Sequence, residues 1–299
     1  MREVDLVRGI RQLAESQPRN KAILRGVGDD CAVIRPPAKQ DLVFTTDFVI
    51  EDRHFTLATH KAADVGHKAL ARSLSDLAAM GAKPLFCLVS LATRAELGKA
   101  WVDGFYSGLL KLAEEFQVTL AGGDLASAEK VTADVMCCGV VPPGKALLRS
   151  GARRGDHIYV TGELGGSALG LKRQRGSAWK RHLRPQPRVK VGLALRKLDV
   201  RSCMDVSDGL SLDLKRLCLE SKVSARLTGA LPMSKGASLE QALHGGEDYE
   251  LIFTTPERMP ARIAGVAITD IGEIVSGSPG AVLWKGELLP PGGFDHFVK

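Results

Sequence analysis

Six aspartates in this chain share one setting, in which an apolar strand or helix meets a turn of glycine, serine or threonine. They are Asp30, Asp47, Asp76, Asp124, Asp205 and Asp208. Any one of them could be an ordinary turn or helix-cap residue. A carboxylate removed from water costs several kcal/mol, however, unless a cation or hydrogen-bond donors receive it. Six aspartates in the same setting therefore indicate a shared role.

The chemistry of these aspartates favours a metal ion. If they converge, two carboxylates about 5 Å apart repel each other by roughly 3 kcal/mol at an effective dielectric near 20. Arginine and lysine do not recur inside the motifs, so metal cations are the expected counter-charge. Oxygen ligands without histidine or cysteine at ligand spacing favour Mg²⁺ over Zn²⁺, and Mg²⁺ usually shares its shell with a phosphate.

Two glycine-rich stretches would let the backbone approach an anion. They read AGGD (121–124) and TGELGGSALGL (161–171), and the second opens a predicted helix whose N-terminus favours phosphate. The chain has neither the GxxxxGK[S/T] pattern of a P-loop nor a protein-kinase signature. Together with the aspartates, these stretches predict a nucleotide bound through several metal ions.

Strand-like and helix-like segments alternate in both halves of the chain. Strands are predicted at 42–50, 84–91, 118–124, 131–141, 157–162, 202–206, 224–229 and 249–255, and helices at 1–17, 61–80, 97–116, 165–172, 188–198 and 207–220. A break rich in proline, glycine and arginine follows at 142–156, and we place a domain boundary inside it. This interleaving predicts two α/β or α+β domains.

Composition describes an ordinary globular protein. The 299 residues allow two domains, and 44% hydrophobic and 25% charged residues are usual values. The six cysteines contain no CxxC pair and predict buried thiols in a reducing compartment. The first 17 residues predict an amphipathic helix rather than a signal peptide, and no apolar run has the length of a membrane span. We therefore expect a cytoplasmic protein with no membrane partner.

The net charge of +7 is concentrated between residues 172 and 201. This segment has eleven lysines and arginines against one acid, Asp199, and its one aromatic residue is Trp179. The lack of a stacking platform favours a solvated helix and loop surface over an RNA or phosphate patch. A non-catalytic nucleic-acid binder is the alternative from another class, and it would leave the six aspartates unexplained.

Nine motifs occur together along the chain and cover nearly all of it. They are GDDCAVI, TTDFVIEDRHF, HKALARSLSDLAAMGAKP, AGGD, LLRSGARRGDHIYVTGELGGSALGL, RHLRPQPR, MDVSDGLSLDL, GGEDYELIFT and GFDHF. In sequence and order they resemble the thiamine-monophosphate kinase family of the PurM-like superfamily. SDLAAMGA and SDGL belong to the superfamily and identify the fold. GGEDYEL, RHLRPxPR and the HF dipeptide (residues 54–55) narrow the resemblance to the thiamine enzyme.

The resemblance implies a two-domain PurM-like fold of the α/β (α+β) class. An N-terminal domain (1–148) would form a dimeric β-barrel flanked by helices and carry the metal and ATP site. A C-terminal α/β domain (149–299) would complete the nucleotide and substrate site. The implied activity is ATP-dependent phosphorylation of thiamine monophosphate to thiamine diphosphate, the last step of thiamine diphosphate biosynthesis, in a homodimer.

The resemblance also implies roles for individual residues. Mg²⁺ ligands would be Asp30, Thr45, Thr46, Asp47, Asp76, Asp124, Asp205 and Asp208, with Asp29 a neighbour of less defined role. ATP would contact Gly122, Gly123, Arg149 and Ser207. The thiamine substrate would contact His54, Glu247 and Phe294.

The implied chemistry needs no general base. A phosphate monoester has a second pKa near 6 and is already a dianion at neutral pH. It needs neutralisation and in-line alignment with the γ-phosphate, so we expect direct transfer without a phosphoenzyme. His54 could instead be a general base or a surface histidine, and Glu247 with Asp248 could cap a turn. Cys31 is expected to be a buried strand cysteine rather than a nucleophile.

Some positions depart from the family pattern. The stretch after GGD usually begins with threonine and often carries an arginine, whereas here it reads LASAEK, and Arg53 beside His54 is unusual. Another ATP-dependent PurM-like enzyme is the nearest alternative function. A selenophosphate synthetase would need a catalytic cysteine or selenocysteine in a glycine-rich N-terminal segment, and a hydrogenase-maturation protein should end in cysteine, whereas this chain ends FDHFVK. An aminoimidazole ribonucleotide synthetase stays a third such alternative.

Overall fold

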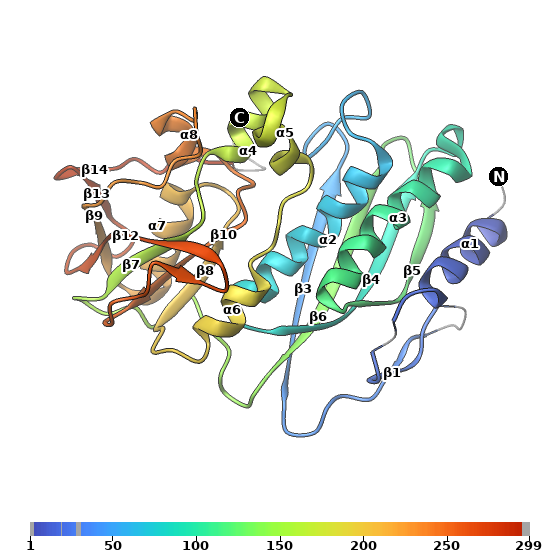
Figure 1. The fold of residues 1–299 in the computed structure, drawn as a ribbon, viewed down its shortest axis with the longest axis horizontal. Helices are drawn as coiled ribbons and strands as arrows, with labels where there is room; N and C mark the ends of the chain where they lie inside the picture. Colours follow the sequence, from blue (N-terminus) through green and yellow to red (C-terminus); the bar gives the residue numbers. More distant parts are fainter. Residues whose placement is uncertain (1–2, 19, 28–30, 295–299) are drawn as a thin grey trace. The chain divides into compact units, whose positions relative to one another are not determined.

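The computed structural model describes residues 3–18, 20–27 and 31–294. They form two compact units, which Figure 1 draws as ribbons. Unit 1 comprises Met1–Leu77 and Ala82–Gly144, and unit 2 comprises Ala78–Gly81 and Lys145–Lys299.

Unit 1 is an open four-stranded sheet with helices against it. Its elements are α1 (Glu3–Glu15), β1 (Ile23–Arg25), β2 (Val33–Ile34), β3 (Asp41–Ile50), α2 (Ala62–Ala79), β4 (Lys83–Thr93), the 3₁₀ helix η1 (Ala95–Leu97), α3 (Gly98–Phe116), β5 (Thr119–Ser127) and β6 (Thr132–Val141). The sheet order is β3-β6-β4-β5, with β4 and β5 parallel and the other pairs antiparallel. β3 and β5 are its edges, and no closed barrel forms within the described part of this one chain.

Helices α2 and α3 lie together on one face of this sheet (Figure 1). Leu70, Leu74 and Leu77 of α2 are fully buried, as their spacing predicts. The two helices approach closely where each presents a glycine: a Cβ on Gly66 would lie 1.9 Å from the Phe105 carbonyl oxygen. α2 is followed by Gly81 with φ of 63°, which ends the helix before β4 begins.

Unit 2 is a mixed sheet with helices. Its elements are β7 (His157–Thr161), α4 (Gly166–Arg173), α5 (Gly176–Leu183), α6 (Val189–Leu195), β8 (Ser202–Val206), α7 (Leu210–Ser221), β9 (Ser224–Leu227), α8 (Leu239–His244), β10 (Glu250–Thr255), β11 (Arg262–Ile263), β12 (Val266–Val275), β13 (Val282–Trp284) and β14 (Glu287–Leu288). The strand order is β14-β13-β9-β12-β7-β10-β8, with β11 paired to β12. Leu210, Leu214 and Leu217 of α7 join the core that covers this sheet.

The structure confirms the predicted α+β class and most of the predicted elements, but it differs from the prediction in several places. The helices α5 and α8 and the ten-residue strand β12 were not predicted, and neither were η1 and the short strands β1, β2, β11, β13 and β14. The helix predicted from residue 207 begins at Leu210, because Ser207–Gly209 form a turn. Cys31 is exposed, so the expectation of a buried strand cysteine is wrong, whereas the other five cysteines are buried.

Among the described residues, no helix combines the length and the apolar character that crossing a membrane requires.

Candidate functional site

Three of the predicted metal ligands lie together in unit 1. Thr45 and Asp47 alternate along β3, so both point to the same face of the sheet. Asp76 comes from α2, and the Thr45 hydroxyl donates a hydrogen bond to its carboxylate. α2 thus brings Asp76 against β3, as the shared role of these aspartates predicts.

The Asp47 carboxylate lies in an environment that disfavours its ionised form. Its pKa is raised to about 6, mainly by burial and also by the nearby carboxylates of Asp76 and Asp134, against the lowering effect of Arg72. The Arg72 guanidinium is 3.5 Å from Asp47 Oδ1, at the long end of a hydrogen bond. Asp47 therefore keeps an incompletely compensated negative charge.

Thr46 and Asp30 stand apart from this group. Thr46 points to the opposite face of β3, and its hydroxyl donates to Asp134 of β6. Asp134 was not predicted, although its place directly opposite Phe48 in the β3–β6 register puts it on the Thr46 face. Asp30 and its neighbour Asp29 lie outside the described residues.

Gly122, Gly123 and Asp124 line a shallow hollow at the edge of unit 1. Val7 and Ile10 of α1, Val27, Tyr106 of α3 and Leu125 complete its lining. Gly123 lies against β4, where a Cβ would be 2.0 Å from the Val89 carbonyl oxygen. Tyr106 was not predicted, and only its helix-face position next to an apolar row could have indicated it. The hollow combines apolar side chains, an aromatic ring and a carboxylate, which suits part of a nucleotide.

The SDG turn of unit 2 is organised by Asp213, a residue the sequence analysis missed. One Asp213 carboxylate oxygen accepts backbone N–H groups from Ser207, Asp208 and Gly209 at 3.0, 2.9 and 3.1 Å. The Asp213 side chain is fully buried. Burial and the Asp208 charge raise its pKa to about 6. The available signal was an aspartate five residues after Asp208, within the same MDVSDGLSLDL motif.

Arginine side chains lie beside two of the predicted metal ligands. Arg216 Nη1 is 2.5 Å from the Asp208 carboxylate and 2.9 Å from that of Asp213. Arg72 precedes Asp76 by four residues inside the HKALARSLSDLAAMGAKP motif and reaches Asp47. The premise that arginine and lysine do not recur in the motifs is therefore wrong, and metal ions are not the sole counter-charge.

Glu247, Phe294 and the Ser207–Asp208 turn lie together in unit 2. The Glu247 N–H donates to the Ser207 carbonyl at 2.7 Å, and the Phe294 N–H donates to the Asp208 carbonyl at 3.0 Å. Asp205 lies on β8 and is buried. Two predicted substrate residues thus border the predicted Mg²⁺ and ATP residues of this unit.

Arg149 and His54 are placed differently from that group. Arg149 is exposed, and its carbonyl accepts the Ser221 hydroxyl at the C-terminal end of α7, the opposite end from Ser207. His54 is 7% exposed, which excludes a plain surface histidine. Its Nδ1 accepts the Ile50 N–H at 3.0 Å, so the ring is fixed by its own turn.

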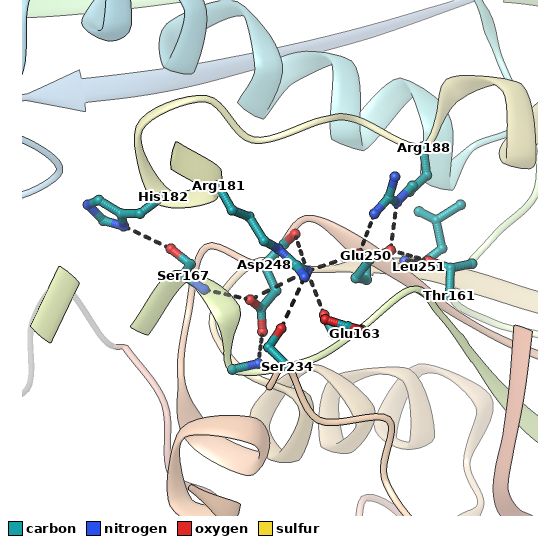
Figure 2. Close-up of polar contacts among 11 residues, drawn as sticks. Thr161, Glu163, Ser167, Arg181, His182, Arg188, Ser234, Asp248, Glu250 and Leu251 are labelled. Atoms are coloured by element: carbon teal, nitrogen blue, oxygen red, sulfur yellow. Dashed lines mark hydrogen bonds and ion pairs between the residues drawn. The ribbon is translucent and has the colours of Figure 1, made fainter. Parts of the chain in front are cut away.

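The RHLRPQPR motif provides partners for a buried glutamate. Arg188 contacts both carboxylate oxygens of Glu250, at 2.6 and 2.5 Å, and Arg181 contacts one at 2.9 Å. Figure 2 shows both arginines directed at Glu250. The interpretation of segment 172–201 as solvated surface is therefore wrong for these two residues. Neither was predicted as a site residue, because Glu250 is 62 positions from Arg188.

The donor set of unit 1 suits Mg²⁺. Asp47, Asp76 and Thr45 offer only oxygen atoms, and the raised pKa of Asp47 reflects a charge that a cation would favour. Within residues 3–18, 20–27 and 31–294, no three histidine, cysteine, aspartate or glutamate side chains form a ready metal-binding group. The residues fit the ion by chemistry, and Asp30 is not among those described.

Comparisons with known proteins agree with the motifs. Residues 28–141 match the AIR synthase related protein, N-terminal domain, and residues 153–285 match the corresponding C-terminal domain. Thiamine-monophosphate kinase of Escherichia coli strain K12 is 40% identical, over 91% of this chain and 92% of that protein.

Two solved structures are similar over almost their whole length. The crystal structure of thiamine-monophosphate kinase from Stenotrophomonas maltophilia K279a has a TM-score of 0.82 and 34% identity, covering 97% of this chain and 98% of that one. AaThiL complexed with AMPPCP and TMP has a TM-score of 0.80 and 31% identity, covering 99% of each. These similarities and the two matched domains show that the chain belongs to the thiamine-monophosphate kinase family, with a two-domain PurM-like fold.

Proposed function

We propose that this protein transfers the γ-phosphoryl group of ATP to thiamine monophosphate, giving thiamine diphosphate in thiamine biosynthesis. The observation that carries this function is the similarity, across 99% of both chains, to a structure that holds AMPPCP and TMP. AMPPCP stands in for ATP with a carbon in place of the β–γ bridging oxygen. The RHLRPQPR and GGEDYEL motifs support the same substrate. We expect the protein to act in the cytoplasm.

Carboxylate and hydroxyl oxygens would hold Mg²⁺ for this reaction. The proposed ligands are Asp30, Thr45, Thr46, Asp47, Asp76, Asp124, Asp205 and Asp208. Support comes from the Thr45–Asp76 contact and from the raised pKa of Asp47. Mg²⁺, when bound, neutralises phosphate charge. The number of ions per site stays a prediction, as does the division of roles between domains 1–148 and 149–299.

The proposed ATP contacts are backbone and side-chain donors. Gly122 and Gly123 border the hollow that Tyr106 lines, which suits part of the nucleotide. Ser207 belongs to the turn that Asp213 fixes through the Ser207 N–H, so its hydroxyl starts from an ordered position. Arg149 is proposed to contact ATP as well, because its exposed side chain is available to phosphate.

The acceptor side of the reaction is proposed to involve His54, Glu247 and Phe294. Glu247 is an anion and suits the cationic thiazolium of thiamine, while the partly exposed Phe294 ring offers an apolar face. The dianionic acceptor phosphate needs no general base, so we propose direct in-line transfer. A stable phosphoaspartate or phosphohistidine trapped after exposure to ATP would contradict that mechanism.

The test is direct detection of thiamine diphosphate from purified protein with ATP, Mg²⁺ and thiamine monophosphate. In parallel reactions, thiamine monophosphate is replaced by thiamine or by aminoimidazole ribonucleotide precursors. We expect product only in the reaction that contains thiamine monophosphate as the acceptor. Folded protein that binds Mg-ATP but forms no thiamine diphosphate would contradict the function while leaving the fold unchanged.

We further propose a homodimer formed through unit 1. β3 pairs with β6 on one side only, and its exposed face carries large apolar residues. Leu42, Phe44 and Phe48 are 38%, 58% and 55% exposed, which favours cover by a second copy. The double substitution Phe44→Glu with Phe48→Glu should give a monomer in sedimentation velocity. Leu288→Glu, at an equally exposed apolar residue of unit 2, should leave the dimer intact; dimers in both variants would refute this interface.

A further inference from the structure

Glu250 is a fully buried carboxylate at the start of β10, and four donor atoms satisfy it. Arg188 binds it with two nitrogens and Arg181 with one, and the Thr161 hydroxyl donates at 2.6 Å. The close approach is built into the backbone as well, because a Cβ at Gly162 would lie 2.2 Å from the Glu250 carboxylate. Two arginines on one carboxylate exceed what neutralisation of Glu250 requires.

Arg181 extends this cluster to the residues before β10. Its Nη2 donates to the Glu163 carbonyl at 2.5 Å and lies 3.6 Å from Asp248 Oδ1. Asp248 is itself buried, and it accepts N–H groups from Gly165 at 2.5 Å and Ser167 at 3.0 Å, at the start of α4. Figure 2 shows Arg181 between Asp248 and Glu250. Arg181 thereby links α5 to two acidic residues of the GGEDYEL motif, Asp248 and Glu250.

Glu247 lies immediately before this tied segment, in a conformation that needs support. Its φ is 64° and that of Tyr249 is 51°, both in the left-handed region that non-glycine residues seldom adopt. The Tyr249 N–H donates to the Val206 carbonyl at 2.9 Å. The Glu247 carboxylate is 3.4 Å from Nδ1 of His182, the residue after Arg181. His182 in turn stacks on Trp179, with ring centroids 5.2 Å apart.

An ion pair of the same chemistry elsewhere in unit 2 gives a comparison. Arg201 binds Asp156, a carboxylate that is 1% exposed, at 2.8 Å. Among the described residues, neither side chain of that pair contacts a residue of the predicted site, so the pair serves as a structural comparison. The Glu250 cluster differs because its arginines converge on the segment that carries Glu247.

We propose that Arg181 and Arg188 are positioning residues, which act through Glu250 and Asp248 to hold the Glu247 carboxylate for the thiamine-phosphate substrate. This inference rests on the proposed function. This role requires no contact between the arginines and the substrate or the reacting atoms. The bidentate contact of Arg188 with Glu250 and the contacts of Arg181 with Glu250 and Asp248 fix the backbone at 247–250. Lysine would keep the charge and lose the planar fork.

The test uses Arg181→Lys and Arg188→Lys in the full-length protein. Displacement of Glu247 should raise KM for thiamine monophosphate by roughly tenfold in each, with KM for ATP and kcat within about twofold of wild type. Arg201→Lys is the matched control, since it weakens a buried arginine–carboxylate pair outside this cluster. It should leave both KM values unchanged. Equal increases in the control would reduce the arginines to a structural role and overturn the inference.

A double-mutant cycle tests whether the arginines act through Glu247. If they do, Arg181→Lys adds little to the KM increase already caused by Glu247→Gln. If the two fold-changes multiply, Arg181 acts independently of Glu247 and the inference fails.

Hydrogen exchange separates this inference from the proposed function, because it requires no substrate. The Glu247 and Tyr249 amides should exchange at least tenfold faster in Arg188→Lys than in wild type, and equally in Arg201→Lys and wild type. Faster exchange with an inactive wild type would refute the function and, with it, the substrate named here. Unchanged exchange with an active wild type would overturn the inference alone.

Discussion

Two groups of carboxylates in this molecule are treated in opposite ways. In unit 1, the Arg72 guanidinium is 3.5 Å from the Asp47 carboxylate, and the pKa of Asp47 is raised to about 6. In unit 2, Glu250 has three arginine contacts no longer than 2.9 Å and a threonine hydroxyl. The protein therefore surrounds Glu250 closely with donors, whereas the charge of Asp47 stays incompletely compensated. For these two residues, the difference separates a carboxylate that fixes a loop from a carboxylate that suits a metal ion.

Asp47→Asn should separate activity from stability in the first group. Loss of a metal ligand should lower kcat by at least about a hundredfold. In metal-free buffer the variant should be as stable as wild type, or more stable by up to about 3 kcal/mol at pH 7, since a pKa of about 6 marks an unfavourable charge. Thiamine diphosphate assays and urea unfolding give the two values. A variant that loses stability together with activity would show that the Asp47 carboxylate, like that of Glu250, is stabilised by contacts within the protein.

Glu250→Gln should have the reverse effect in the second group. It leaves two largely buried arginines without their carboxylate, so the free energy of unfolding should fall by about 3 kcal/mol. Glu273→Gln is the control, because its contact with Arg226 is 40% to 49% exposed and should contribute less than about 1 kcal/mol. Equal losses in the two variants, measured by urea unfolding, would contradict the distinction.

Asp248 gives the second group a pH dependence. Burial and the Glu250 charge raise its pKa to about 6, against the lowering effects of Arg181 and the Ser167 and Gly165 N–H groups. The folded state therefore binds this proton more tightly than the unfolded state, and the resulting stability is lost as pH rises from about 4 through 6. The free energy of unfolding of wild type minus that of Asp248→Asn should fall by about 2–3 kcal/mol over this interval. A flat difference would show that Asp248 ionises normally.

Local patterns predicted the positions of single elements well. The leucine spacing of 61–80 gave α2, and the apolar residues around Asp47 and Asp205 gave β3 and β8. Thr45 and Thr46 were predicted to share the same role, whereas the pleat of β3 places them on opposite faces with different partners. β12 was missed because its apolar residues are interrupted by threonine, aspartate and glycine, and tertiary pairing with β7 and β9 overrides that weak pattern.

The candidate site was predicted by residue type more than by partner. Aspartates were recognisable because carboxylates at strand ends are chemically conspicuous. Their counter-charges were not, since Arg188 and Glu250 are separated by 62 positions and meet only in the folded unit. Asp213 escaped for a different reason: as one acid in an amphipathic helix it resembles a surface residue until its burial is known.

Magnesium-dependent stabilisation tests most directly whether Asp47, and not Glu250, belongs to a metal site. The unfolding temperature would be measured with AMPPCP, with and without Mg²⁺, for wild type, Asp47→Asn and Glu250→Gln. We predict that Mg²⁺ raises it by the same increment in wild type and Glu250→Gln, although the latter starts lower, and that most of the increment is lost in Asp47→Asn. An undiminished increment in Asp47→Asn would show that the unit 1 carboxylates do not hold the metal.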